Sequence, residues 1–227
     1  MKACCIRTIA ELDVAVRAGV SIAGFVSKMK ATNALSDAQI AKLAGRVKPP
    51  VVPILVTREV TARGIREHVE RTNTTAVQLV RAIADDELRQ LRELSPGLRI
   101  VRVAYIAGEE SIGPAVARSE LADMLLLDTA HGHATQEQLG NTGKPHDWSV
   151  SRRIRDTADC PVMLAGGLSP ANLEEAIETV RPFAVDVCTG VRDSNNKLVE
   201  ERIQRFVEIA SSFEAFEPAN RHRWNRP

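Results

Sequence analysis

Short apolar runs rich in β-branched residues alternate with amphipathic segments along almost the whole chain. Runs of four to seven such residues are typical of buried strands, and segments of the length found between them are typical of crossover helices. Strands are expected at 3–6, 20–26, 51–56, 76–80, 99–105, 124–127, 161–164 and 184–187. Eight strand–helix units without a linker favour one closed α/β structure, the (β/α)8 TIM barrel, over an open sheet with two unpaired edges.

Helix-start signals support this alternation. Thr8 is expected to be an N-cap, with Glu11 three residues later completing a capping box, and Ser36 is expected to cap the next helix. The weakest element follows the fifth strand, because Gly113 and Pro114 interrupt it. The remaining helices are expected near 62–71, 85–94, from 149 onwards, 172–180 and 199–211.

The length of 227 residues suits one such barrel, which we place at residues 1–213. Aromatic residues make up only 4% of the chain, so aliphatic side chains must fill the core, as in parallel sheets covered by helices. Residues 214–227 are basic and expected to form a surface extension. Within it, Trp224 is expected to pack back on the barrel or on a partner subunit.

The charge balance limits the partners. The chain has 30 Lys and Arg against 29 Asp and Glu, which argues against bulk nucleic-acid binding but leaves room for a small phosphorylated ligand. No apolar run reaches membrane-spanning length, and no signal-peptide pattern is present at the N-terminus, so no membrane association is expected. The four cysteines have no zinc-like spacing, and a reducing, cytoplasmic location is the simplest expectation.

The carboxyl ends of the expected strands carry two candidates for acid–base chemistry, since this rim holds the active site in TIM barrels. Cys4 lies at the end of the first strand, where a thiol of lowered pKa acts as a base or nucleophile, although free cysteines are also often simply buried. Asp128 directly follows three leucines at the end of the sixth strand. Partial burial there would make it a general acid, while the alternative is a helix cap or a loop ion pair.

Glycine turns follow the seventh and eighth strands. Gly166 and Gly167 come after one, and Thr189 and Gly190 after the other. Glycines leave backbone N–H groups uncovered, and the loops after strands seven and eight are the usual phosphate site of this fold. These residues are therefore predicted to bind a phosphate.

Three histidines fall in or near the sixth loop. His131 and His133 form a pair able to bind a metal, with His146 further on, but no third ligand has a defined spacing. Solvated loop histidines are the expectation, and no metal or organic cofactor is predicted.

At this point the sequence resembles the phosphoribosylanthranilate isomerase family, TIM-barrel enzymes of tryptophan biosynthesis. LLLDT, GNTGKPHDW, VMLAGGLSPANLEEAI and RPFAVDVCTGV are similar to the family's L-L-D-T, G-G-T-G-K-x-F-D-W, L-A-G-G-L-x-P-x-N-V and P-x-x-V-D-V-S-S-G-V, in the same order. KACCIRT resembles K-I-C-G-I-T, and GFVSKMKATNALS and VQLV are looser matches. The resemblance spans nearly all of residues 1–213.

The resemblance implies an Amadori rearrangement of a phosphoribosylated aromatic amine. A general acid protonates the furanose ring oxygen, the ring opens to a Schiff base, and a general base removes the C2′ proton. Mapped by motif, the base is Cys4 and the acid is Asp128. The substrate-binding positions that the resemblance implies are Lys30, Asn33, Val80 and Asp186.

Departures from the family pattern concentrate at the aromatic-acid end of the site. Asn33 stands where the family has an Arg that holds the anthranilate carboxylate, and Val80 stands where it has His. Cys5 replaces a Gly, and Arg192 replaces a Glu. Asn donates hydrogen bonds without the charge of Arg, so the amine of the substrate is left open between anthranilate and a related compound.

Two other functions remain as alternatives. One is a phosphate-ligand-binding barrel without catalysis, which the presence of both Cys4 and Asp128 disfavours. The other is a different sugar-phosphate isomerase or epimerase, although the related histidine-pathway isomerase normally uses two Asp residues. The protein is expected to be a monomer or a homodimer.

Overall fold

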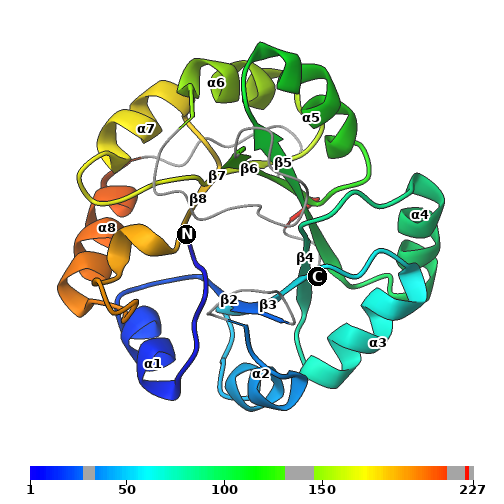
Figure 1. The fold of residues 1–227 in the computed structure, drawn as a ribbon, viewed down its shortest axis with the longest axis horizontal. Helices are drawn as coiled ribbons and strands as arrows, with labels where there is room; N and C mark the ends of the chain where they lie inside the picture. Colours follow the sequence, from blue (N-terminus) through cyan, green and yellow to red (C-terminus); the bar gives the residue numbers. More distant parts are fainter. Residues whose placement is uncertain (28–33, 131–145, 214–222, 225–227) are drawn as a thin grey trace.

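The eight parallel strands close into one barrel with the strand order β1-β2-β3-β4-β5-β6-β7-β8, which confirms the predicted fold class. The computed structural model describes residues 1–27, 34–130, 146–213 and 223–224. Figure 1 looks down the barrel and shows the strands inside a ring of helices. The strands are β1 (Lys2–Ala3), β2 (Ile22–Val26), β3 (Val52–Thr57), β4 (Ala76–Leu79), β5 (Arg99–Ile106), β6 (Met124–Thr129), β7 (Val162–Leu164) and β8 (Ala184–Val187).

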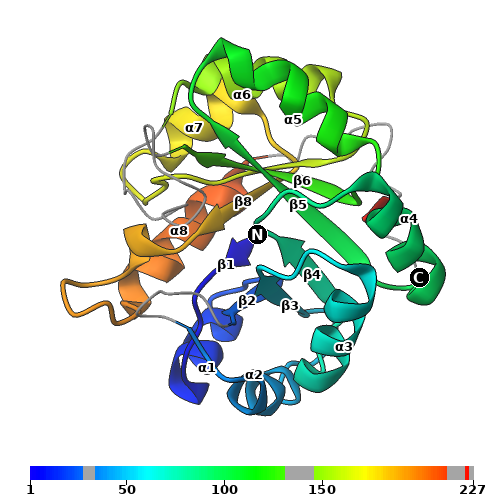
Figure 2. The ribbon, with the colours of Figure 1, turned by 45° about the vertical axis from the view of Figure 1, so that its right-hand side comes forward.

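A helix follows each strand and covers the outside of the barrel, as the side view in Figure 2 also shows. Two short 3-10 turns, η1 (Glu109–Ser111) and η2 (Thr189–Val191), precede the helices after β5 and β8. The α-helices are α1 (Ile9–Arg17), α2 (Asp37–Ala44), α3 (Ala62–Thr72), α4 (Asp85–Leu94), α5 (Ile112–Ser119), α6 (Trp148–Thr157), α7 (Leu173–Val180) and α8 (Glu200–Ser212).

The expected helix caps are partly confirmed. Ser36 caps α2 and forms a complete capping box with Gln39. Thr8 caps α1 by accepting a hydrogen bond from the N–H of Glu11. The prediction of a complete capping box is wrong, because the Glu11 side chain does not bond back to the N–H of Thr8. The Glu11 carboxylate instead accepts from the N–H of Arg7 at 2.8 Å, and it also pairs with Arg192 across the barrel closure.

The segment after β5, which we predicted to be the weakest element, forms a regular helix. Pro114 lies in the first turn of α5 (Ile112–Ser119), where a missing N–H breaks no intrahelical hydrogen bond. Gly113 lies in the same turn, so neither residue interrupts the helix interior.

Alternation along the strands divides the core in two. Successive strand residues point to opposite faces, so Ile54 and Val56 of β3 pack inside the barrel while Leu55 packs outward against the helices. All three side chains are at most 2% exposed. The same alternation places the last inward residue of each strand at the mouth of the barrel.

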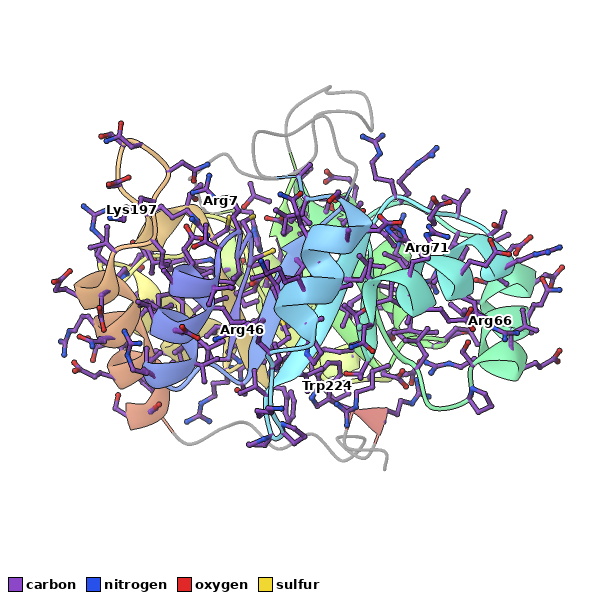
Figure 3. The ribbon with its side chains drawn as sticks, turned by 90° about the horizontal axis from the view of Figure 1, so that it is seen from below. Arg7, Arg46, Arg66, Arg71, Lys197 and Trp224 are labelled. Atoms are coloured by element: carbon purple, nitrogen blue, oxygen red, sulfur yellow. The ribbon has the colours of Figure 1, made fainter. Side chains whose placement is uncertain are left out.

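Trp224 from the C-terminal segment packs into the inner core and is only 8% exposed. The guanidinium of Arg99, at the start of β5, lies 5.5 Å from the centre of its ring. Arg223 donates hydrogen bonds to the carbonyls of Ser119 and Glu120 just before β6. Figure 3 shows Trp224 at the lower edge of the barrel, so this part of the tail packs back against the amino-terminal ends of the strands.

Within the described part of the chain, no helix combines the length and apolar character needed to span a membrane.

Candidate active site

Cys4 lies at the carboxyl end of β1, between β8 and β2. Its N–H donates to the carbonyl of Val187 at 2.8 Å. On the other side, a Cβ at Gly24 would lie 3.3 Å from the Cys4 sulfur, so the glycine leaves room for the thiol. Cys5 has a φ of 64° and turns the chain away, which is why β1 ends sooner than the expected strand 3–6.

A buried ion pair lies beneath the thiol. The Lys2 ammonium is fully buried and lies 2.7 Å from the Asp186 carboxylate, which joins β1 to β8. Burial opposes the charge on Lys2, but Asp186 and the Cys4 thiol outweigh it and raise the pKa of Lys2. Lys2 therefore stays a cation beside Cys4.

The surroundings of Cys4 favour its thiolate. A hydrogen bond with Cys5 and the charge of Lys2 lower the pKa of Cys4, against the effect of burial. Cys5 itself lies 2.8 Å from the sulfur of Cys188. Hydrogen bonds with Cys188 and with Cys4, together with burial, raise the pKa of Cys5 well above its ordinary value, so Cys5 stays protonated and acts as the donor to Cys4.

Asp128 lies half-buried at the carboxyl end of β6, where the sequence analysis placed the acid. One of its carboxylate oxygens accepts from the N–H of Thr129 at 2.8 Å. Asp128 is the register partner of Tyr105 on β5, and burial and the Asp128 carboxylate raise the pKa of Tyr105. The hydroxyl of Tyr105 donates to the carbonyl of Val80 at 3.3 Å, so these residues form one continuous wall of the mouth.

His146 is not the solvated loop histidine that we expected. Its Nδ1 lies 3.0 Å from the Thr129 hydroxyl and its Nε2 lies 2.5 Å from the Ser151 hydroxyl. Burial lowers the pKa of His146 to about 4, so the ring is neutral at neutral pH. The histidine thus connects the residue after Asp128 to helix α6.

The glycine turns after β7 and β8 lie against each other. Gly166 has a φ of 83°, and a Cβ there would lie 2.3 Å from the Thr129 hydroxyl. A Cβ at Gly190 would lie 2.0 Å from the carbonyl oxygen of Leu168. Only glycine permits approaches this close. No acceptor in the described ranges bonds the N–H of Gly166 or Gly167, which leaves both donors for a ligand.

The charge reversal at position 192 has a structural basis. Arg192 is buried, and one of its amino groups binds the Glu11 carboxylate at 2.8 Å. Its other amino group donates to the carbonyl of Cys5 at 2.6 Å. Arg192 therefore supports the backbone that carries Cys4 rather than facing the mouth.

The structure brings together Cys4, Asp128, Val80 and Asp186 with both glycine turns at one end of the barrel. The predicted residues Lys30, Asn33, His131 and His133 lie outside the described residues. Sequence reasoning missed Lys2 and Tyr105, and it noted Arg192 only as a departure from the family pattern. Lys2 could have been found from its charge and its place two residues before Cys4, since alternate strand residues share a face.

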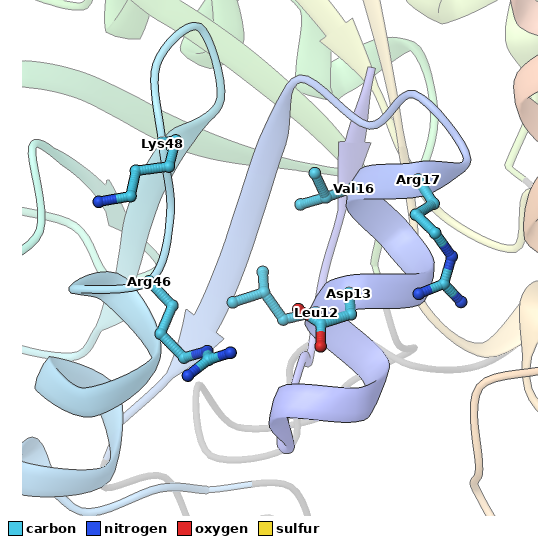
Figure 4. Close-up of a pocket in the computed structure, with 6 residues that line it drawn as sticks. All are labelled: Leu12, Asp13, Val16, Arg17, Arg46 and Lys48. Carbon is cyan, nitrogen blue, oxygen red and sulfur yellow. The ribbon is translucent and has the colours of Figure 1, made fainter.

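Other features lie away from this mouth. Figure 4 shows a pocket between α1 and the segment after α2, lined by Leu12, Val16, Arg46 and Lys48 among others. It opens on the outer helical layer and not at the strand ends. Among the described residues, no group of three or more His, Cys, Asp or Glu side chains is arranged to hold a metal ion.

A thiol directly after β1 and a carboxylate on β6, with glycine turns after the two strands between them, define the class: a TIM barrel with a candidate acid–base pair beside a candidate phosphate site. The sequence profile of the family N-(5'phosphoribosyl)anthranilate (PRA) isomerase matches residues 1–208. The chain belongs to this family.

Relatives and solved structures agree with the assignment. The N-(5'-phosphoribosyl)anthranilate isomerase 2 of Methanosarcina mazei is 33% identical over 93% of this chain and 94% of its own. The N-(5'-phosphoribosyl)anthranilate isomerase of Methanocella arvoryzae is 35% identical, over 84% of this chain and 87% of its own. The crystal structure of phosphoribosyl anthranilate isomerase from Thermotoga maritima is 27% identical, with a TM-score of 0.82 over 93% of this chain and 98% of that one.

Proposed function

We propose that this chain isomerises N-(5'-phosphoribosyl)anthranilate to the corresponding aminoketose, with Cys4 as general base and Asp128 as general acid. The observation that carries the proposal is the Cys4 thiol above the buried Lys2–Asp186 pair, at the same end of the barrel as Asp128. The names of the relatives support the substrate. So does a phosphoribosyl anthranilate isomerase structure in complex with reduced 1-(o-carboxyphenylamino)-1-deoxyribulose 5-phosphate, whose fold matches this chain with a TM-score of 0.79.

The proposed reaction assigns one proton transfer to the general acid and one to the general base. Asp128 in its acid form donates a proton to the furanose ring oxygen; the bond from that oxygen to C1′ breaks, and the nitrogen lone pair forms a Schiff base with C1′. The Cys4 thiolate then removes the proton from C2′, which gives an enolamine; C1′ takes up a proton as the C2′ hydroxyl loses one, and the aminoketose forms. Atoms and electrons balance within the substrate, so the proposed step requires no redox cofactor.

The phosphate end is proposed to lie against the turns after β7 and β8. The uncovered N–H groups of Gly166 and Gly167 would donate to phosphate oxygens, with Thr189 and Gly190 on the facing turn. The acid on β6 and the base on β1 flank these two strands. A ribose held here by its 5′-phosphate therefore lies between the two catalytic groups. A monomer or homodimer remains our prediction for the assembly.

The test is turnover of the proposed substrate by wild type and by single variants. Cys4→Ala and Asp128→Asn are each expected to lower kcat by a factor of about 10² to 10⁴, the usual contribution of one acid or base. Cys160→Ala and Asp13→Asn serve as matched controls, because Cys160 is buried beside β7 and Asp13 is exposed on α1. Near-wild-type turnover by Cys4→Ala would remove the thiol from the mechanism. A wild-type chain that binds inorganic phosphate without turning over the substrate would favour the non-catalytic alternative.

A further inference from the structure

The order of strands fixes the direction in which the amine end of the substrate extends. The candidate phosphate turns follow β7 and β8, and in the closed ring of eight strands β3 and β4 lie opposite them. Figure 1 shows this placement across the barrel. In the proposed substrate the amine is attached to C1′, at the far end of the ribose from the 5′-phosphate. The aromatic acid therefore extends toward β3, β4 and β5.

Arg58 lies on this side, directly after β3 (Val52–Thr57). The hydroxyl of Thr57 lies 3.0 Å from Nδ1 of His68 on α3, so Thr57 faces the helices. Val56 faces the interior of the barrel, and strand alternation directs Arg58 to the same side, at the mouth. The acidic neighbour Glu59 turns away toward the start of α3, where its carboxylate oxygen lies 3.2 Å from the Cβ position of Gly64.

Arg58 differs from Arg92 and Arg192, which are also withdrawn from solvent. Arg92 binds Asp123 at 2.7 Å, and Arg192 binds Glu11 at 2.8 Å. Arg58 is half-buried, yet no carboxylate in the described part of the chain lies within ion-pair distance of it. Its positive charge opposes the rise in the pKa of Tyr105 on β5, as the charge of Arg118 also does. A guanidinium held there presents a planar donor pair that matches a carboxylate.

We propose that Arg58 binds the carboxylate of the anthranilate moiety and so selects the amine of the substrate. The inference rests on the proposed function. Arg58 also supplies the charge that Asn33 lacks at the position where the family has an Arg. In this arrangement the positive charge that faces the carboxylate comes from Arg58 at the end of β3. Tyr105 and Val80, on the adjoining strands, provide an aromatic and apolar wall for the ring between the carboxylate and the reacting carbon.

The test compares two substrates that differ only in the carboxylate, N-(5'-phosphoribosyl)anthranilate and N-(5'-phosphoribosyl)aniline. Arg58→Gln is expected to lower kcat/KM for the anthranilate compound by about ten- to a hundredfold, which corresponds to about 1.4–2.8 kcal/mol. For the aniline compound we expect a change of less than about twofold, because no carboxylate is present to lose its partner. Arg58→Lys keeps the charge without the planar fork and is expected to give an intermediate loss for anthranilate alone.

Arg81→Gln is the matched control. Arg81 follows β4 and is exposed. Its substitution removes the same charge from the neighbouring part of the rim. Little change in this variant, with a large loss in Arg58→Gln, supports direct contact over a general effect of charge. Equal losses for both substrates in Arg58→Gln would overturn the inference, since they would point to an effect on the acid or on folding. An unchanged preference for the anthranilate compound would overturn it as well.

Failure of the proposed isomerase activity is distinguishable from failure of the Arg58 inference. A wild-type chain that turns over neither compound overturns the isomerase activity. The affinity for reduced 1-(o-carboxyphenylamino)-1-deoxyribulose 5-phosphate and for its carboxylate-free counterpart then tests Arg58 by calorimetry. A weaker Kd in Arg58→Gln for the first ligand only supports the carboxylate contact. If each ligand binds Arg58→Gln as tightly as it binds wild type, the inference is overturned.

Discussion

Replacing Lys2 by Met removes the cation beneath Cys4 and leaves the Asp186 carboxylate buried without its partner. At the 2.7 Å separation of the two groups, and with an effective dielectric constant of about 20, their attraction is about 6 kcal/mol. Desolvation of both ions cancels a large part of this attraction, but removing Lys2 leaves the Asp186 carboxylate as an uncompensated buried charge. We expect Lys2→Met to lower the free energy of unfolding by about 3–5 kcal/mol.

The loss is expected to depend on pH. Burial raises the pKa of Asp186, and Lys2 opposes that rise, so the folded-state pKa is raised further in Lys2→Met. A carboxyl with a raised folded-state pKa favours folding below its unfolded pKa of about 3.9, and this contribution is lost as the pH rises through the folded pKa. The deficit relative to wild type should therefore be larger at about pH 8 than at about pH 5.

Urea denaturation of wild type and variant at both pH values measures this difference. Lys42→Met is the control, because Lys42 is exposed on α2, and no measurable change is expected there. The double variant Lys2→Met with Asp186→Leu should recover most of the stability, because no lone charge remains. Wild-type stability of Lys2→Met at about pH 8, within about 0.5 kcal/mol, would refute the reasoning.

The same substitution has a separate effect on catalysis. The lysine charge lowers the pKa of Cys4, so its removal raises that pKa. If Cys4 acts as a thiolate base, activity falls below its pKa, and the acidic limb of the kcat/KM profile should move to higher pH in Lys2→Met. The double variant, although stable, should keep the displaced limb. A limb that stays in place in both variants would exclude Lys2 from setting the state of the thiol.

Two further predictions concern the ends of the barrel. Gly190→Ala places a Cβ 2.0 Å from the Leu168 carbonyl and should separate the two glycine turns; calorimetry with inorganic phosphate should show about tenfold weaker binding or more, whereas an unchanged Kd would place the phosphate elsewhere. Trp224→Ala removes a ring that is 8% exposed and lies over Arg99, and should lower the free energy of unfolding by about 2–4 kcal/mol. Because Trp224 lies at the end opposite the mouth, kcat should not change in the folded variant; a loss of kcat with full stability would contradict this placement.

Local patterns predicted most of the architecture. The alternation of apolar runs and amphipathic segments determines the strands and helices, since both periods depend on neighbouring residues only. It predicted β8 (Ala184–Val187) and α4 (Asp85–Leu94) with the bounds observed. It also placed Cys4 and Asp128 at strand ends, and family motifs supported their roles. Boundaries were less certain where a single residue decides, as at Cys5, whose left-handed backbone ends β1.

Only the tertiary structure decided which of these residues meet. Glu11 reads as the second half of a local capping box, yet it binds Arg192, 181 positions away along the chain. Likewise, Lys2 meets Asp186 only because β8 pairs with β1 and closes the barrel. Such partners are chosen by strand closure and by the need to neutralise a buried charge, and neither leaves a periodic signal in the sequence. The sequence by itself therefore determined the barrel and the strand ends that hold Cys4 and Asp128, while barrel closure decided the electrostatic surroundings of Cys4.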